Sequence, residues 1–585
     1  MKDQPSLVIR NGLIADGLGG ELFVSDIAIV NGVIAAIGKD LPRYEGAEDI
    51  DADGKLVTPG YIDLHTHYDG QAVWSDNFAP SSAHGVTTVI MGNCGVGFAP
   101  CRPAEHDMLV SIMEGVEDIP EVVLTKGLDW SWETFPEYLN TIESRPHDVD
   151  FAAYLPHSPL RVYVMGARGA AREAATADDL AKMEEVAFEA LQAGALGFAT
   201  SSIVAHRKRD GDFIPSYQAQ EAEYQAIARA LKRAGGKLFQ VTLEQRRPVE
   251  TEEYFPMMTR VSRTTGGTLM FSLGQHASHP DAWRRALTAL EEANALDGVS
   301  IRPQVFPRPV GMLLGHEVTL NPFCFCPSYQ PLRDLPLAER IAALRTPEMR
   351  GRLLSEESMD PTNPVYGVVR DFERHYRFVS ANYEPPIADN LAEVARRTGR
   401  PALEIAYDWL LENDGKAMIL ATLLNYSSGT LAEVREMITN EHTVLGLGDG
   451  GAHYGLVCDA SFPTFMLTHW ARDRAEGRLS VSEVVRQLTS EPANLIGLRD
   501  RGVLAPGYKA DINIIDHEKL TLLLPGVKYD LPGGGRRLDQ GAEGYLATIV
   551  SGSVIRRNGK PTGALPGRLV RGGRAQPAAT AAAAE

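Results

Sequence analysis

The most constraining feature of the sequence is a regular alternation of strand-like and helix-like patterns through its middle, about residues 58–500. Residues 85–91 have a buried-strand pattern, 177–192 an amphipathic helix pattern with an acidic first turn, and 193–199 the next strand pattern. A further helix pattern follows at 219–234. Repeated strand–helix units predict a parallel sheet, and at this length they predict a (β/α)8 TIM barrel, an α/β fold.

The two ends of the chain, residues 1–57 and 501–585, are rich in short strand patterns. Asn-Gly pairs at 11–12 and 31–32 stand between apolar runs, and such pairs are strong hairpin signals. Because strand patterns return near the C-terminus, we expect the two ends to form one small composite β-sandwich domain.

A chain of 585 residues is too long for one compact core, so we expect the barrel, residues 58–500, to carry an addition. Residues 303–400 are rich in proline and lack a clean strand–helix repeat. This pattern predicts an insertion over the mouth of the barrel. The tail, residues 578–585, is rich in alanine and is predicted to be disordered.

The formal net charge of −19 constrains the partners. Nucleic acids and anionic membranes bind to clustered Lys and Arg, so an acidic surface disfavours both and we expect a small-molecule substrate. A homo-oligomer stays open. The start of the chain lacks the apolar core of an export signal, and no run approaches the roughly 20 apolar residues of a membrane helix. Five cysteines in so long a chain do not make a disulfide framework, so we expect a cytoplasmic location.

The strongest local motif is an apolar run, residues 60–64, that ends in His65-Thr66-His67. Side chains at i and i+2 of a strand share a face, and barrel active sites lie at the carboxyl ends of the strands. Two imidazoles there would converge on one point, as a metal requires. Taken alone, such a pair is more often simply solvated, but its place at the start of the barrel pattern favours a metal site.

A second candidate is Asp449, within the glycine-rich segment 445–453 near the end of the strand–helix region. A carboxylate between glycines at the tip of a late barrel strand can approach a metal closely. A lone Asp-Gly pair is more often a turn in which the aspartate stabilises its own loop. The histidine pair upstream favours the metal interpretation.

Cys94 is the third candidate, because it follows an apolar strand pattern inside the glycine-rich loop 92–95. A thiolate there would ligate zinc or act as a nucleophile, although a lone cysteine is usually a small core residue. The other four cysteines have no such setting. Cys324 and Cys326 form a C-x-C pair in the proline-rich insertion, where metal binding is the less expected outcome.

Seven segments together resemble the D-aminoacylase branch, the N-acyl-D-amino-acid deacylases, of the amidohydrolase superfamily. They are GYIDLHTHYDGQ at 60–71, HGVTTVIMGNCGVGFAP at 84–100, GALGFATS at 194–201, GLGDGGAH at 446–453, SEPANLIGLRDRG at 490–502, GYKADINIID at 507–516 and TGALPGRLVRG at 562–572. The GNCG loop is particular to this branch. The resemblance implies a barrel with a composite β-sandwich and zinc bound at four positions, which are His65, His67, Cys94 and Asp449. It also implies that Asp449 is the proton shuttle.

Two motifs of that branch are missing, T-H-x-R on the strand after the Gly-Gly turn and S-H-x-K on the next strand. Counted from the Gly-Gly turn and from Ser272, the two histidine positions fall on Val241 and Leu273. The arginine and lysine positions fall on Leu243 and Gln275. Since neither valine nor leucine binds metal, we expect part of the family's site to be incomplete. Four nearby side chains would compensate if the register slipped: Glu244, Gln240, His276 and His279.

The sequence indicates candidate substrate-binding residues less clearly than metal ligands. Arg308 stands where relatives have an aromatic residue, and either binds a carboxylate or pairs with an acidic neighbour. Gln275 takes the position of the lysine that suits a substrate carboxylate. His157 matches a strand-end motif of the family and either lines the pocket or supports it, and His453 follows the Asp449 loop as a further pocket candidate.

The remaining set supports zinc-dependent hydrolysis. Three protein ligands plus a water are a catalytic zinc arrangement, and zinc lowers the pKa of that water towards about 7. We therefore expect one zinc ion per chain and cleavage of a C–N bond in a linear or cyclic amide, such as an N-acyl amino acid. The zinc-bound water would attack, with Asp449 as general base and acid. Two alternatives stay open: a lyase or decarboxylase on the same scaffold, or an inactive binding protein.

Overall fold

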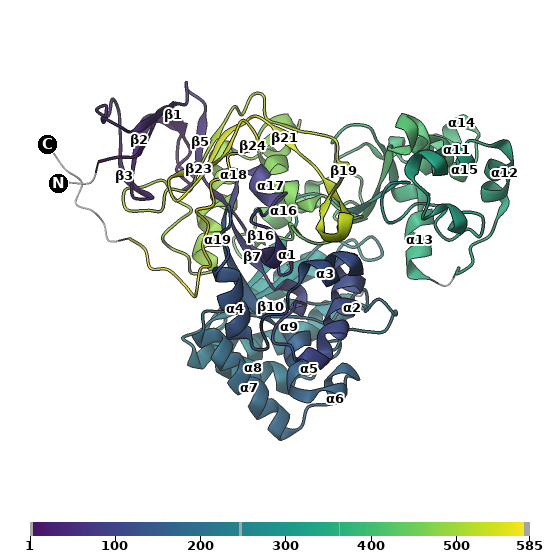
Figure 1. Cartoon of the computed structure of the whole chain (residues 1–585), viewed down its shortest axis with the longest axis horizontal. Helices are drawn as coiled ribbons and strands as arrows, with labels where there is room; N and C mark the ends of the chain where they lie inside the picture. Colours follow the sequence, from purple (N-terminus) through teal and green to yellow (C-terminus); the bar gives the residue numbers. More distant parts are fainter. Residues whose placement is uncertain (1–3, 245–247, 362, 578–585) are drawn as a thin grey trace.

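The computed structural model describes residues 4–244, 248–361 and 363–577, so the predicted disorder of the tail lies outside the described residues. The centre of the molecule is an eight-stranded parallel sheet whose strands are neighbours in chain order (Figure 1). The strands are β6 (Tyr61–Asp63), β7 (Val86–Met91), β8 (Asp150–Pro156), β9 (Gly197–Ser201), β10 (Leu238–Thr242), β11 (Leu269–Leu273), β12 (Ile301–Val305) and β16 (Val444–Leu445).

Contacts just beyond β6 and β16 close this sheet into a barrel. Thr66 forms a parallel bridge with Gly450. The amide of His67 donates to the Gly450 carbonyl at 2.7 Å, and the amide of Asp449 donates to the His65 carbonyl at 2.9 Å. The predicted (β/α)8 barrel is confirmed, and its closing seam is made by the two segments that carry the histidine pair and Asp449.

Apolar side chains fill the interior of the barrel. One buried cluster takes residues from almost every strand, namely Ile62, Ile90, Ala152, Tyr154, Ala199, Leu238, Met270 and Val444. Ala493 of α19 (Ser490–Leu495) and the following Ile496 belong to the same cluster and close one end of the barrel. The interior is therefore a packed core, which leaves chemistry to the other end, where the strands terminate.

Helices α7 (Ala177–Gln192), α8 (Glu221–Arg233) and α9 (Pro248–Thr265) lie on one side of the barrel (Figure 1), and α10 (Ala282–Asn294) packs against α9. The helix predicted at 177–192 is α7, and its first turn is capped as its sequence indicates. The Thr176 hydroxyl accepts from the Asp179 amide at 3.2 Å, and the Asp179 carboxylate accepts from the Thr176 amide at 2.8 Å.

The two ends of the chain share one nine-stranded mixed sheet. Strand β5 (Leu56–Pro59) of the N-terminal segment pairs antiparallel with β17 (Ile512–Ile515) of the C-terminal segment. A separate hydrophobic cluster, with residues from both segments, packs within this unit. The composite β domain is therefore confirmed.

One of the two predicted hairpin turns is wrong. Strand β1 (Leu7–Ile14) runs straight through the Asn-Gly pair at 11–12, which forms a bulge in its pairing with β2 (Phe23–Val30). The pair at 31–32 is a turn, between β2 and β3 (Val33–Gly38). An Asn-Gly pair suits both outcomes, because a bulge also needs a residue with positive φ.

A lobe is inserted between the last two barrel strands and projects to one side in Figure 1. Strand β12 still belongs to the barrel, so the lobe begins after Val305. It contains a three-stranded sheet of β13 (Val310–Leu314), β15 (Met418–Leu424) and β14 (His375–Phe378). Its helices are α11 (Leu337–Leu344), α12 (Pro347–Ser355), α13 (Pro364–Arg370), α14 (Leu391–Thr398) and α15 (Ala402–Leu410). The lobe has a hydrophobic cluster of its own.

A hairpin of the C-terminal segment leaves the β domain and reaches the barrel. Strands β19 (Gly526–Leu531) and β20 (Gly535–Asp539) pair antiparallel, and β19 lies beside α3 (Glu121–Gly127) in Figure 1. The Leu538 amide donates to the Tyr454 carbonyl at 2.6 Å. The C-terminal segment thus contacts the loop that follows Asp449, a contact that the sequence patterns did not predict.

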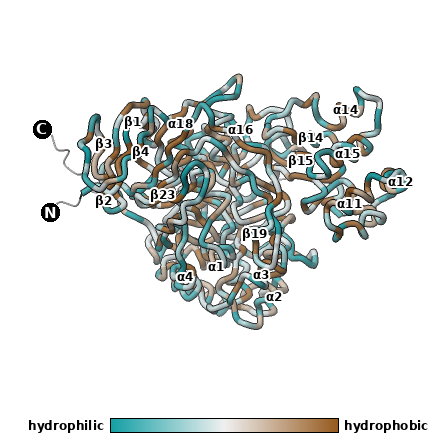
Figure 2. Tube along the Cα trace, turned by 45° about the horizontal axis from the view of Figure 1, so that its top comes forward, coloured by the Kyte–Doolittle hydropathy of each residue, from teal (hydrophilic) through white to brown (hydrophobic). Residues whose placement is uncertain are grey.

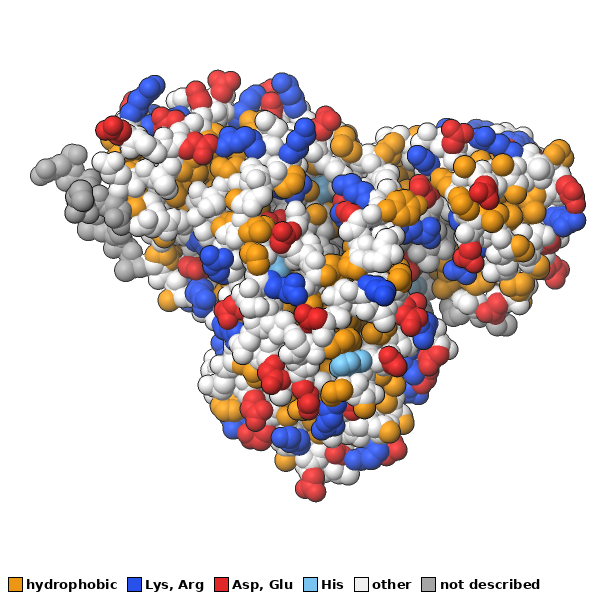
Figure 3. Space-filling view, viewed as in Figure 1, with side chains coloured by type: hydrophobic (Ala, Val, Ile, Leu, Met, Phe, Trp, Pro, Cys, Tyr) orange, Lys and Arg blue, Asp and Glu red, His pale blue; other side chains and the backbone are white. Residues whose placement is uncertain are grey.

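Hydrophobic residues follow the buried strands in Figure 2, while Lys, Arg, Asp and Glu are interspersed over the face seen in Figure 3. Within the described ranges, each helix is too short or too polar to span a bilayer.

Candidate metal centre

His65 and His67 follow β6 directly and lie at the closing seam of the barrel. Both residues are buried, and their ring centroids are 5.4 Å apart. The residue between them also anchors the segment, because the Thr66 hydroxyl donates to the Ile90 carbonyl at 2.8 Å. The backbone bonds across the seam and this side-chain bond fix both imidazoles at the end of the barrel where the strands terminate.

The glycines around Cys94 are required by the shape of its loop. Gly92 has a φ of 84° and Gly95 a φ of 67°. A Cβ on Gly92 would lie 2.4 Å from the Tyr154 carbonyl oxygen, and one on Gly95 would lie 2.7 Å from the Thr200 Cα. Cys94 itself has a φ of 55°, which is uncommon for a residue with a side chain.

Asn93 ties this loop to the histidine segment. Its side-chain amide donates to the Ile90 carbonyl at 2.9 Å and to the Thr66 carbonyl at 3.3 Å. Since Thr66 stands between the two histidines, the backbone that carries Cys94 is held against the backbone that carries the imidazoles.

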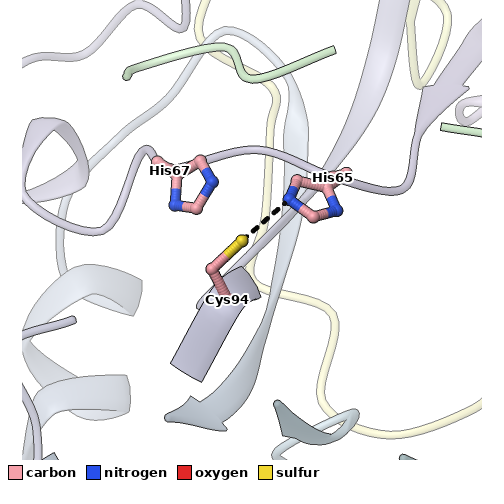
Figure 4. Close-up of side chains that lie close together, drawn as sticks. All are labelled: His65, His67 and Cys94. Atoms are coloured by element: carbon pink, nitrogen blue, oxygen red, sulfur yellow. Dashed lines mark hydrogen bonds between the residues drawn. The ribbon is translucent and has the colours of Figure 1, made fainter. Parts of the chain in front are cut away.

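The three side chains converge. The Cys94 sulfur points toward both imidazoles (Figure 4) and lies 3.4 Å from His65 Nε2. One ligand atom from each residue lies within 4.8 Å of the others, and no second group of three such ligands occurs in the described part of the chain. Burial raises the pKa of the thiol, but the facing imidazoles of His65 and His67 outweigh it and bring the pKa down to about 7. A buried thiolate with two imidazoles is a donor set that suits zinc.

Asp449 faces the two histidines from the other side of the seam. Its Oδ1 lies 3.5 Å from His65 Nε2 and 3.7 Å from His67 Nε2. Burial raises the pKa of this carboxyl, and the imidazoles of His67 and His65 outweigh burial and hold the pKa well below its usual range. The flanking glycine is required, because a Cβ on Gly448 would lie 2.2 Å from Asp63 Oδ2.

Two side chains that the sequence did not indicate orient the histidine rings, each through the Nδ1 atom of one ring. His65 Nδ1 lies 2.8 Å from Gln304 Oε1 on β12. An amide oxygen only accepts, so Nδ1 carries the proton and Nε2 faces Cys94 with its lone pair. Glu117, the last residue of α2 (His106–Glu117), lies 3.3 Å from His67 Nδ1. Nothing in the local sequence marks either residue, since Gln304 follows Arg302 and Pro303 in β12 and Glu117 ends a helix.

A cavity lies beside Asp449 and is partly built by the C-terminal hairpin. Its lining includes Asp449, Gly450 and Asp459 from the barrel, and Arg537 and Leu538 from β20. The carboxylate that faces the histidines therefore also borders a small cavity of about 20 Å³, which has room for a water molecule.

The positions expected for the missing histidines, Val241 and Leu273, lie on neighbouring strands. Val241 of β10 pairs with Phe271, and Leu273 ends β11. Val241 and Leu243 are both buried in the hydrophobic core, and the alternation of strand side chains places them opposite to the Thr242 side chain.

None of the four compensating side chains joins the cluster in the described residues. The Gln240 amide donates to Thr242 Oγ1 at 3.1 Å, and a Glu244 carboxylate oxygen accepts from the Val204 amide at 3.3 Å. His276 and His279 bridge each other through their backbones in an exposed turn. From the same strand as Gln240, Thr242 approaches the cluster, with its hydroxyl 3.5 Å from the Cys94 sulfur.

Arg308 and His157 are engaged by other parts of the chain. Buried Arg308 donates to Asp459 Oδ1 at 2.9 Å and to Ser461 Oγ at 2.9 Å. His157 lies 2.8 Å from Thr200 Oγ1 and 3.2 Å from Glu223 Oε2. Arg308 therefore has an internal acidic partner, and His157 has supporting contacts.

Gln275 and His453 differ in their relation to the cluster. The Gln275 side-chain oxygen accepts from the Ser427 amide at 3.2 Å, at the edge of the lobe. His453 follows the Asp449 loop, and its Nε2 lies 3.6 Å from Glu117 Oε2, the carboxylate that also faces His67. Of the four substrate-binding candidates, the structure brings only His453 to the rim of the metal cluster.

Comparison with known proteins identifies relatives with the same architecture. An uncharacterised protein of Mycobacterium tuberculosis (strain ATCC 25618 / H37Rv) is 28% identical over 95% of this chain and 92% of its own length. The D-aminoacylase of Alcaligenes xylosoxydans xylosoxydans is 26% identical over 87% of this chain and 88% of its own. The N-acyl-D-glutamate deacylase of Bordetella bronchiseptica, solved with zinc and a phosphonate inhibitor, has a TM-score of 0.63 at 21% identity over 97% of this chain and 100% of that one.

The match to a family extends over most of the chain. The model of the amidohydrolase family covers residues 48–556, which include the whole barrel and strands of the β domain from both ends. This protein therefore belongs to the amidohydrolase family.

Proposed function

We propose that this member of the amidohydrolase family is a mononuclear zinc hydrolase that cleaves the amide bond of an N-acyl amino acid. The observation that carries the proposal is the convergence of His65, His67 and Cys94 opposite the Asp449 carboxylate, at the seam where the barrel closes. Relatives with this architecture include a D-aminoacylase and a zinc-containing N-acyl-D-glutamate deacylase.

The residues present suit one zinc ion. Thiolate and imidazole are donors that zinc prefers, and the three ligand atoms lie within 4.8 Å of one another. Bound there, zinc would polarise the scissile carbonyl and promote ionisation of water. A second ion would need further ligands, and Val241 and Leu273, the positions expected for the missing histidines, are buried and apolar.

Asp449 is the proton carrier in this proposal. Its depressed pKa keeps the carboxylate ionised at neutral pH, so it is ready to take a proton from the attacking water. The leaving amide nitrogen needs a proton before the C–N bond breaks, and Asp449 would deliver the one that it took.

The preference for an N-acyl amino acid rests on the relatives' substrates. Gln275, at the position of the family's lysine, bonds to the Ser427 amide, so the carboxylate of an amino-acid substrate would find no lysine there. From the relatives' names we expect the D enantiomer to be preferred.

The proposal is tested by amine release from a panel of N-acetyl and N-formyl amino acids in both enantiomers. Zinc-loaded wild type is expected to release amine, and the Asp449→Asn variant to be slower by about a hundredfold or more. Release of carbon dioxide without free amine would replace this reaction with a decarboxylation. No turnover of any substrate by zinc-loaded protein would contradict the proposed hydrolysis.

A further inference from the structure

The loop after β9 crosses the mouth of the barrel and is fixed at both sides. The Ser202 amide donates to the Thr242 carbonyl at 2.8 Å, next to the Cys94 loop. On the other side, the Arg209 amide donates to the Ser111 carbonyl of α2 at 3.0 Å. Residues 202–209 thus run from the strand end beside Cys94 to the helix that ends at Glu117.

A glycine in α2 allows this close approach. A Cβ on Gly115 would lie 2.3 Å from the Arg207 carbonyl oxygen and 2.5 Å from the Arg209 amide nitrogen. The loop is therefore seated on the helix two residues before Glu117, whose carboxylate faces His67. The residue that precedes Arg207 therefore also lies near this end of α2.

His206 is the residue so placed. Its Nδ1 is buried and has no hydrogen-bond partner among the described residues. The charged groups that act on it are the metal-cluster residues His65, His67 and Asp449, together with His453. Burial, followed by the charges of the nearby histidines, lowers the pKa of His206 to about 3, so the imidazole is neutral at physiological pH.

The neighbour of His206 is fully accounted for by the loop itself. The Arg207 guanidinium stacks on the Phe213 ring at 3.9 Å and donates to the Val204 carbonyl at 3.2 Å and the Gly211 carbonyl at 2.8 Å. Arg207 is therefore held by contacts within the loop, while Nδ1 of His206 has no hydrogen-bond partner among the described residues. A buried polar atom without a partner is costly, and a bound substrate would supply the partner.

We propose that His206 contacts the substrate and donates a hydrogen bond to the oxygen of the scissile carbonyl. This inference rests on the proposed amide hydrolysis and adds a residue to it. His206 lies outside the group of mutually close metal ligands, so it acts on the substrate and not as a ligand. A neutral donor suits an oxygen whose negative charge develops only in the transition state.

The experiment compares His206→Ala with wild type in steady-state hydrolysis, with zinc content measured on the same samples. We expect kcat to fall about a hundredfold, as for loss of one oxyanion donor, while KM changes by less than about threefold because the bond strengthens in the transition state. Zinc content is expected to stay at the wild-type value. His206→Gln, which keeps a donor, is expected to recover part of kcat.

His442→Ala is the matched control, because His442 precedes β16 at the opposite end of the barrel. It is expected to keep wild-type kcat and KM. A folded, zinc-loaded His206→Ala with unchanged kcat would overturn the inference and leave the proposed function standing. Loss of zinc from that variant would also overturn it, because His206 would then be a ligand. A wild type that releases no amine from any substrate would overturn the proposed function and this inference with it.

Discussion

At the residue scale, His65 depends on Gln304 for the orientation of its ring. The bond from His65 Nδ1 to Gln304 Oε1 fixes the tautomer that presents a lone pair at Nε2. Gln304→Ala is expected to weaken zinc binding by about 10- to 100-fold, as measured by competition with a chromogenic chelator. Gln304→Glu keeps an acceptor and should retain most of the affinity. An affinity within twofold of wild type for Gln304→Ala would show that the bond does not matter.

The pH dependence of zinc binding should follow Cys94. Burial raises the pKa of its thiol, and the imidazoles of His65 and His67 bring it to about 7, so the thiolate is present above that pH and lost below it. Zinc must displace a proton in acid, and its affinity is expected to fall by up to about tenfold per pH unit for each proton displaced. Titrations between about pH 8 and about pH 6 measure this slope.

Cys94→Ser provides the control for that slope, because a serine hydroxyl carries no titrating proton in this range. Its zinc affinity is expected to be lower throughout and to depend less steeply on pH, by about one proton. An unchanged slope in Cys94→Ser would assign the pH dependence to the histidines instead.

The candidate residues themselves were accessible from the sequence, while their supporting partners were not. His65, His67, Cys94 and Asp449 stand in glycine-rich or strand-end motifs whose local spacing predicts convergence. Gln304, Glu117 and His206 are ordinary residues in their local sequence and gain their roles from contacts across the barrel. Such contacts depend on the tertiary structure, which spacing along the chain does not report.

At the element scale, the loop that carries Cys94 requires its first glycine. Gly92→Ala would combine a positive φ with a Cβ 2.4 Å from a backbone oxygen of Tyr154. Gly46→Ala is the matched control, because Gly46 has a similar φ of 81° with nothing within 4 Å of its Cβ. The control is expected to lower the free energy of unfolding by about 1 kcal/mol, and Gly92→Ala by about 2 kcal/mol more.

Urea unfolding of both variants tests this expectation, with zinc content as a second reading. Gly92→Ala should also lose zinc, since the displaced loop carries a ligand, whereas Gly46→Ala should keep it. Equal destabilisation of the two variants would mean that the loop relaxes around the added methyl group and that the close approach is not needed.

Elements with a strong local pattern were predicted well, and those fixed by long-range pairing were not. Helix α7 coincides with the pattern at 177–192, because its apolar spacing and its cap are both local. The Asn-Gly pair at 11–12 is a bulge and not the predicted hairpin turn, because the long pairing of β1 with β2 extends through it.

At the scale of the whole molecule, a buried ionic cluster joins the barrel to the C-terminal segment. Asp150 of β8 accepts from Arg501 at 2.6 Å and lies 3.2 Å from Lys509. Asp150→Asn would leave the buried Arg501 without its acidic partner on the barrel, and is expected to cost about 3–5 kcal/mol of unfolding free energy. Asp210→Asn, at an exposed pair with Lys208, should cost less than about 1 kcal/mol.

The melting temperatures of both variants, measured by thermal unfolding, test this expectation. A melting temperature lowered equally in the two would show that the cluster adds no more than a surface pair. A selective loss in Asp150→Asn would instead support the β domain and barrel as one cooperative unit.

The assembly of both termini into one β domain was predictable, because both ends carry short strand patterns on either side of the long strand–helix region. The position of the β19–β20 hairpin was not predictable. Its contact between Leu538 and Tyr454 joins two segments that are far apart in the sequence, and no local motif indicates that they meet. That contact places C-terminal residues beside the Asp449 cavity, so the C-terminal segment belongs to the site as well as to the β domain.

The most direct test of the proposed mononuclear zinc centre is elemental analysis of metal per chain, on wild type and on His65→Ala, with His442→Ala as control. We predict about one zinc ion per chain in wild type and in the control, and its loss in His65→Ala, as the three-ligand geometry requires. About two ions per chain would contradict a single site, and the absence of metal from carefully prepared wild type would contradict zinc-dependent hydrolysis itself.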